Sequence, residues 1–192
     1  MLKRFAHSRL RAFEKDFGYD AGYMHELVEA DVGAVMKFMK VQAISGYRKN
    51  VPEDVWYAAK ITGAMHEDCG PCTQLAVTMA ERANVSTTTL RAIAARDDSA
   101  LPEDVRLGVE FSRAVLARDA RADKLREEIV RRWGFLGLVS IAFTLIGARV
   151  YPTLKYALGH GHACTRLHVA GEPIPVRKEN LVNRVMSLGA EA

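Results

Sequence analysis

Apolar residues recur at intervals of three and four along most of this chain, and the alternation typical of β-strands is almost absent. The segment 21–46 shows the pattern most clearly. Six of its apolar residues follow the helical spacing: Leu27, Val28, Val32, Val35, Met36 and Met39. Gly46 then provides a natural end. We therefore predict one helix of more than 20 residues in this segment and an all-α fold for the chain.

Four further helix starts are indicated by local chemistry. Proline followed by two acidic residues occurs at 52–54 and again at 102–104, which is typical of a first helical turn. Pro71 marks a third start, with a helix expected to reach about Asn84. Ser86 can cap a fourth helix through its hydroxyl group.

A long helical stretch is predicted from Asp123 toward Leu158, with a break at Gly134 or before Pro152. Its apolar run at 133–148 is shorter than the ~20 residues that a membrane span needs. Apolar residues occur all around this run, so it must be buried on most sides. We predict a core or interface helix, no membrane span and a homo-oligomer.

The whole chain, 1–192, is predicted to be a single compact domain of seven or eight helices. The basic segment 1–13 is interpreted as the first helix because acidic residues follow it at once. Segment 159–192 is predicted to be an irregular tail with one short helix near 181–186, and Pro173 and Pro175 favour extended backbone within it.

Charge and cysteine content narrow the function classes. The net charge is +4, but 27 basic residues are interleaved with 23 acidic ones, so no nucleic-acid partner is expected. The sequence shows no export signal. Three cysteines in such a chain indicate reduced thiols with chemistry and a cytoplasmic location.

Two of these cysteines form the motif Cys69-Gly70-Pro71-Cys72 at a predicted helix start. The free N–H groups and the dipole of a first turn stabilise a thiolate, lowering its pKa from ~8.5 toward neutral. A spacing of two residues allows the sulfurs to form a disulfide with little backbone change. The motif therefore predicts a redox dithiol. Cys69, nearer the helix end, is the expected attacking thiolate, and Cys72 is the expected resolving thiol.

Three polar residues precede the motif. His66 has an unperturbed pKa suited to a base near pH 7, and it would lie over Cys69 if the intervening turn were helical. It can equally be an exposed histidine at a helix end. Glu67 could relay a proton, although a carboxylate near sulfur also raises the thiol pKa. Asp68 is interpreted as a capping residue.

The helix-like segment before CGPC argues against a thioredoxin fold. The segments "PEDVWYAAKITGAM", "CGPC" and "TQLAVTMAERANVS" instead resemble the alkylhydroperoxidase D / carboxymuconolactone decarboxylase superfamily, over roughly 20–160. The resemblance implies a small helical oligomer that reduces a peroxide or disulfide through the dithiol. It implies no organic cofactor and a thiol or protein reductant, such as a peroxiredoxin system. The family's relay glutamate and histidine fall here on Tyr57 and Ala76. Nothing in the cysteine pattern supports lactone decarboxylation.

A zinc site is the alternative. His160, His162, Cys164 and His168 form a second cluster of possible ligands, which could join Cys69 and Cys72 in a four-coordinate site. Their spacing matches no established zinc finger. On this hypothesis the protein is a non-catalytic helical protein that binds zinc.

Overall fold

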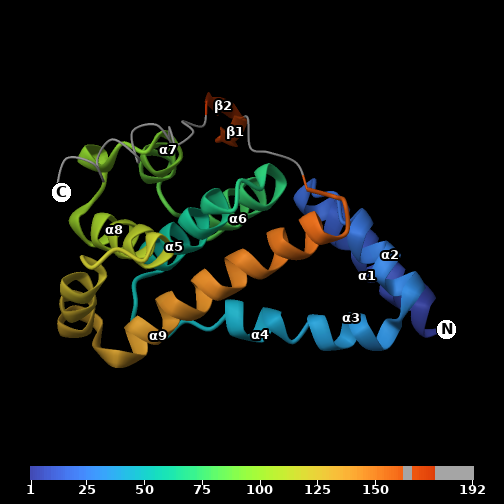
Figure 1. Cartoon of the computed structure of the whole chain (residues 1–192). Helices are drawn as coiled ribbons and strands as arrows, with labels where there is room; N and C mark the ends of the chain where they lie inside the picture. The colour runs from blue at the N-terminus through green and yellow to red at the C-terminus, as the bar shows by residue number, and fades with distance from the viewer. Residues whose placement is uncertain (162–165, 176–192) are drawn as a thin grey trace, which may run out of the picture.

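The computed structural model describes residues 1–161 and 166–175 of the chain, and these residues are mostly helical, which confirms the all-α prediction (Figure 1). The α-helices are α1 (Leu2–Phe17), α2 (Gly22–Ala30), α3 (Val32–Phe38), α4 (Val41–Ser45), α5 (Glu53–His66), α6 (Gly70–Arg82), α7 (Thr87–Ala95), α8 (Glu103–Ala117) and α9 (Ala122–Ala157). A short 3₁₀ turn, η1 (Asp98–Ala100), and two strands, β1 (Arg166–Val169) and β2 (Glu172–Pro175), complete the described elements. That the whole chain, 1–192, forms a single domain stays a prediction.

The predicted helix starts are confirmed. Pro52 and Pro102 are the N-caps of α5 and α8, each with a ψ of 147° that turns the chain into the helix. Pro71 lies in the first turn of α6. At the start of α7, the Ser86 hydroxyl accepts a hydrogen bond from the backbone N–H of Thr89 at 3.1 Å. Local chemistry thus decides where these helices begin.

The single long helix predicted for 21–46 is wrong, because the segment forms three short helices, α2, α3 and α4. Asp31 ends α2 in an extended conformation and caps α3, where its carboxylate accepts a hydrogen bond from the N–H of Gly33. A residue that satisfies a new helix start in this way competes with continuation of the preceding helix. Gly46 follows the last of the three, as expected.

Helix α9 breaks at one of the two predicted positions. Gly134 has φ 69° and ψ −179°, a conformation that only glycine adopts readily, and the helix axis bends there. Pro152 lies inside the helix without ending it. The part of α9 after Gly134 runs across the molecule and reaches the N-terminal helices (Figure 1).

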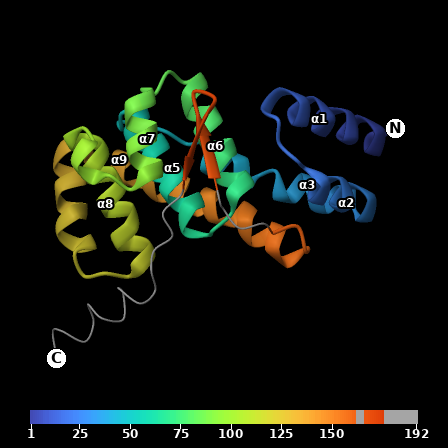
Figure 2. The same cartoon turned by 90° about the horizontal axis from the view of Figure 1, so that it is seen from above.

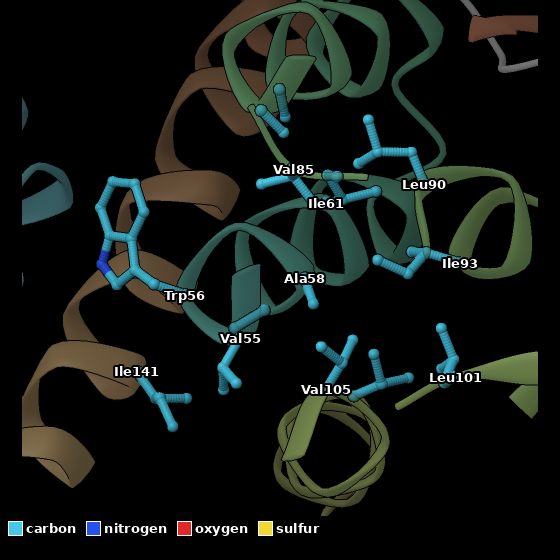
Figure 3. Packing of buried hydrophobic residues seen from close by; sticks show 14 of the residues in the cluster. Val55, Trp56, Ala58, Ile61, Val85, Leu90, Ile93, Leu101, Val105 and Ile141 are labelled. Atoms are coloured by element: carbon cyan, nitrogen blue, oxygen red, sulfur yellow. The ribbon is translucent and has the colours of Figure 1, made fainter. Parts of the chain in front are cut away.

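The main apolar core lies between α5, α7, α8 and α9 (Figure 3). Val55, Ile61, Val105 and Ile141 are fully buried there. Small residues let the helices approach closely: a Cβ atom added at Gly108 would lie 2.7 Å from the Val55 side chain. The core therefore fixes α5, and with it the turn that leads into α6.

A second apolar cluster joins α1, α2 and α3, and its buried members include Tyr19, Met24 and Val28. These helices lie to one side of α5–α8 in both views (Figures 1 and 2). The pair α1–α2 is also joined by two stacked histidines, His7 and His25, whose Nδ1 atoms lie 2.6 Å apart. The N-terminal helices thus have an apolar cluster of their own.

The predicted irregular tail contains a β-hairpin, which the sequence analysis missed. Strands β1 and β2 pair antiparallel, with Leu167 opposite Ile174 and His168 opposite Pro173. The hairpin is held on α6 by the Gln74 side chain, which donates to the carbonyl of His168 at 3.0 Å and accepts from its N–H at 2.7 Å. The expected extended backbone near Pro173 is confirmed. The short helix predicted near 181–186 lies outside the described residues.

By length and composition α9 could cross a membrane, since its most apolar 18-residue window has a mean hydropathy of 1.7. One face of the helix is instead buried in the protein against α4, α5 and α8, through Ile141 and Leu145 among others. Several apolar residues of α9 remain exposed, among them Phe135, Leu136 and Ile146. An apolar face of this kind is typical of a contact surface, and the predicted oligomer stays a prediction.

Candidate dithiol site

The CGPC motif lies where α5 passes into α6. Helix α5 ends at His66, a two-residue turn follows, and Cys69 is the N-cap of α6 in an extended conformation. Asp68, which we interpreted as the cap, instead has φ 50° and reverses the chain before the helix begins. The predicted helix start at the dithiol is therefore confirmed, with Cys69 in the capping position.

The two sulfurs differ in access. Cys69 is fully buried, whereas Cys72 is 8 % exposed. Both are free thiols, and both pack against Ala64. Cys72 also borders a large apolar cavity between the N-terminal helices and α5, α6 and α9. The expectation that Cys69 lies at an open helix end is wrong, because the end is covered.

The less accessible thiol, Cys69, is the more acidic of the two. The pKa of Cys69 is lowered to about 7, chiefly because its sulfur accepts a hydrogen bond from the Cys72 thiol. Burial opposes this effect, while the backbone N–H of Cys72 and the ammonium group of Lys155 assist it, and Asp68 opposes it. A thiolate at Cys69 is thus stabilised near neutral pH.

Cys72 holds its proton more strongly. Its pKa is raised because its thiol is the donor in the hydrogen bond to Cys69, and burial and the adjacent thiolate add to the effect. Lys155 and Tyr19 act in the opposite direction. The pair therefore loses its first proton at Cys69, while Cys72 is the sulfur that borders the cavity.

Lys155 of α9 supplies the cation near the dithiol. Its side chain is 2 % exposed, and its Nζ atom donates a hydrogen bond to the hydroxyl oxygen of Tyr19 at 3.5 Å. The same Nζ lies 4.8 Å from the ring centre of Tyr19 and 5.2 Å from that of Tyr23. The ammonium group is thus held between two aromatic faces, which interact favourably with a cation.

Tyr19 connects Lys155 to the dithiol. Its hydroxyl oxygen lies 3.9 Å from the sulfur of Cys72, within hydrogen-bond range for sulfur. Burial is the main reason that the pKa values of Tyr19 and Tyr23 are raised, so both remain neutral phenols that can donate. Lys155, Tyr19, Cys72 and Cys69 form a continuous polar chain in an otherwise apolar region.

The two other predicted site residues lie outside this chain. His66 is exposed at the last position of α5, and the non-helical turn after it removes the geometry that would have placed it over Cys69. Glu67 forms an ion pair with Arg149 of α9, with 2.5 Å between Oε1 and Nε. Their catalytic roles stay predictions, and Glu67 has a clear structural partner.

The two positions at which the sequence resemblance implied a relay glutamate and histidine hold Tyr57 and Ala76. Tyr57 packs edge-on against the ring of Trp56, and burial raises its pKa. Ala76 is buried and borders the same cavity as Cys72. Alanine at this position leaves apolar wall where a histidine would present a base.

The possible zinc ligands are only partly described. His160 pairs with Glu26 at 3.1 Å, and His168 is exposed on β1. His162 and Cys164 lie outside the described residues. Among residues 1–161 and 166–175, no group of three or more histidine, cysteine, aspartate or glutamate side chains is arranged to bind a metal.

Sequence reasoning missed Tyr19, Tyr23 and Lys155. A signal for Lys155 existed, since it continues the buried face of α9 at helical spacing after Ile141, Leu145 and Pro152. A lysine on such a face is unusual and points to a buried charge. No comparable signal identifies Tyr19, because it lies between α1 and α2 and reaches Cys72 only through the tertiary fold.

Comparison of the chain with protein-family models, with curated proteins and with solved structures found no match.

Proposed function

We propose that this protein is a thiol–disulfide oxidoreductase that reduces a disulfide or peroxide through Cys69 and Cys72. The observation that carries the proposal is that the two sulfurs differ in acidity and in access to the cavity. Cys69 has a pKa of about 7 and is buried, whereas Cys72 is hydrogen-bonded to it and borders a cavity. A purely structural cysteine pair has no need of a buried lysine beside it.

The geometry favours entry of substrate at Cys72, the reverse of the order predicted from the sequence. The Cys69 thiolate accepts the proton of the Cys72 thiol as the Cys72 sulfur attacks a substrate disulfide. That attack forms a mixed disulfide and releases one substrate thiolate, which is protonated by solvent. Cys69 then loses its proton and attacks the Cys72 sulfur, which forms the Cys69–Cys72 disulfide and releases the second thiolate.

The same pair can reduce a hydroperoxide. The Cys72 sulfur attacks the terminal oxygen, the O–O bond breaks, and an alcohol leaves as Cys72 becomes a sulfenic acid. Cys69 condenses with this sulfenic acid to give the disulfide and water. In either case two thiols are oxidised for each substrate reduced, so an external thiol or a protein reductant must restore the dithiol. Attack of that thiol on Cys72 expels Cys69, whose low pKa makes it the better leaving group.

The broader setting of the proposal comes from the sequence resemblance. The all-α fold and a CxxC motif at a helix start are consistent with an alkylhydroperoxidase D-like protein in a thiol-reducing compartment such as the cytoplasm. Absence of the relay groups at Tyr57 and Ala76 means that proton transfer must use other residues. Cys69 is our proposed acceptor of the Cys72 proton, and the polar chain from Lys155 through Tyr19 to Cys72 supplies hydrogen-bond donors that stabilise negative charge on the pair.

Turnover of hydroxyethyl disulfide and cumene hydroperoxide, with dithiothreitol as reductant, tests the proposal. Cys69→Ser and Cys72→Ser should each abolish turnover, while Cys164→Ser, the matched control, should retain it. Protein purified without reductant should lose two thiols reversibly and contain no metal. Stoichiometric zinc, released on thiol modification, would establish the zinc-binding alternative and remove the redox proposal.

A further inference from the structure

The cavity that borders Cys72 has a volume of about 650 Å³, within the range of sites that bind small molecules. Its wall comes from α1, α2 and α3 on one side and from α5, α6 and α9 on the other, so it lies between the two apolar clusters. Most of the wall is apolar, with Phe5, Phe13, Met24, Met36 and Met79 among the larger side chains. Methionine and phenylalanine surfaces of this kind adapt to flexible apolar chains.

The charged side chains described on the cavity wall are all basic. Two lysine or arginine side chains line the cavity, Arg9 of α1 and Lys60 of α5, and no aspartate or glutamate does so within the described residues. Arg9 is exposed, whereas Lys60 is only partly accessible. An apolar cavity with cationic groups and no acidic group is complementary to an apolar molecule that carries a negative charge.

Lys60 has the character of a binding group. Its Nζ lies 3.9 Å from the ring centre of Trp56 and 5.7 Å from that of Tyr57. In the described part of the chain no carboxylate lies within ion-pair distance of Lys60, unlike Lys3, which pairs with Glu29. Burial lowers the pKa of Lys60 to about 8, so the group is mostly an ammonium ion at pH 7. Lys60 also lines the cavity, so this partly desolvated ammonium group has aromatic contacts but no anionic partner among the described residues.

We propose that this cavity binds a long-chain carboxylate, with the carboxylate paired to Lys60 and the alkyl chain against the apolar wall between α1–α3 and α6. The chain of such a ligand would cover the accessible edge of Cys72, since Cys72 and Lys60 border the same space. The site therefore couples ligand binding to access to the dithiol. Binding of the carboxylate needs no redox chemistry, so this proposal can be tested separately from the proposed oxidoreductase function.

Calorimetric titration of the full chain with dodecanoate and with dodecanol, both below their aggregation concentrations, tests the site. The two probes share one alkyl chain and differ in head-group charge. The wild-type protein should bind one dodecanoate per chain about tenfold more tightly than dodecanol, as expected for a charge-assisted hydrogen bond. Bound dodecanoate should also slow alkylation of Cys72 in a Cys69→Ser, Cys164→Ser background.

Two matched variants locate the head group. Lys60→Met should abolish the preference for dodecanoate and leave dodecanol affinity unchanged, which also shows that the cavity is intact. Arg9→Met should keep the preference. A preference that is lost in Arg9→Met instead, or that is absent from the wild-type protein, overturns the assignment to Lys60. If neither dodecanoate nor dodecanol binds, the proposed ligand class is wrong.

Discussion

Lys155 and Tyr19 are 136 positions apart in the sequence, yet the ammonium group of one donates a hydrogen bond to the hydroxyl oxygen of the other at 3.5 Å. This contact ties α9 to the loop between α1 and α2, directly beside Cys72. It also places a cation that, together with the stronger effect of the hydrogen bond from Cys72, favours a thiolate at Cys69 despite the nearby Asp68. The stabilising cation comes from a distant helix, not from the residues around the motif.

Replacement of Lys155 should therefore raise the pKa of the Cys69 thiol. Lys155→Met keeps the length of the side chain and removes the charge, so the expected increase is about one pH unit, or ~1.4 kcal/mol. The measurement is the ultraviolet absorbance of the thiolate as a function of pH, in a Cys164→Ser background. Lys124→Met, a change at the start of α9, is the control and should leave the titration unchanged. Overlapping curves for Lys155→Met and the parent would exclude Lys155 as the stabilising cation.

His66 should have little effect on the same titration. If His66 lay over Cys69 as its spacing suggested, His66→Gln would raise the thiol pKa by about one unit. Because α5 ends at His66 and its side chain is exposed, we now expect a change of no more than a few tenths of a unit. A full unit of increase would restore His66 as a base and would require that the turn at 67–68 close over Cys69.

The rate of disulfide exchange should depend on pH through the Cys69 pKa of about 7. Below that pH both thiols are protonated, so the rate should fall about tenfold for each pH unit; above it the rate should level off. In Cys69→Ser, the base that accepts the Cys72 proton is missing and burial raises the pKa of Cys72, so the rise should move to higher pH. The reaction of hydroxyethyl disulfide with the reduced protein gives both profiles. A wild-type rise centred near pH 8.5, the value of an ordinary thiol, would contradict the assignment.

The order of the cysteines can be read from a trapped intermediate. Cys69→Ser should accumulate a mixed disulfide on Cys72, because the accessible sulfur remains and the resolving thiol is gone. Cys72→Ser should form little, since Cys69 is fully buried. Mass spectrometry after reaction with hydroxyethyl disulfide distinguishes the two. Trapping only in Cys72→Ser would return to the order predicted from the sequence, and equal trapping would support neither.

The exposed face of α9 predicts self-association. Ile146 is 50 % exposed and Phe135 is 69 % exposed, although both belong to an otherwise apolar helix. Light scattering at micromolar concentration should give a mass of at least twice the 21.3 kDa of one chain. Ile146→Lys should reduce that mass without lowering the helix content, because the residue is already exposed in the single chain. A wild-type mass of 21.3 kDa would refute the prediction.

The predictable part of this protein is the part governed by local chemistry. Ser86 starts its helix by accepting a hydrogen bond from the first turn, whereas Pro52 and Pro102 do so through their restricted backbone and the acidic residues that follow them. The prediction of a continuous helix at 21–46 was wrong because Asp31 caps a new helix, which apolar spacing does not reveal. Strands β1 and β2 have four residues each, too few for a reliable alternating pattern.

The candidate site also has residues that the sequence could identify and residues that it could not. Cys69 and Cys72 could be identified from their spacing and from Pro71, which are properties of one helix start. Lys155 and Tyr19 could not be assigned to the dithiol, because only the packing of α9 and of the N-terminal helices brings them there. The expected position of His66 over Cys69 assumed a helical turn between them. The two-residue turn at 67–68 changes the direction of the chain, so a spacing of three residues does not place the two side chains on one face.

The separate apolar cluster of α1–α3 makes the dithiol sensitive to motions that leave the main core intact. Tyr19 belongs to that cluster and touches Cys72, so a local opening of the N-terminal helices would take Tyr19 away from the sulfur while α5, α8 and α9 stay packed. By thermodynamic reciprocity, any free energy that this contact adds to the reduced thiol is also added to the closure of α1–α3. Oxidation of the two cysteines should therefore shift the opening equilibrium of the first 38 residues, and opening of those residues should shift the redox equilibrium of the cysteines by the same free energy.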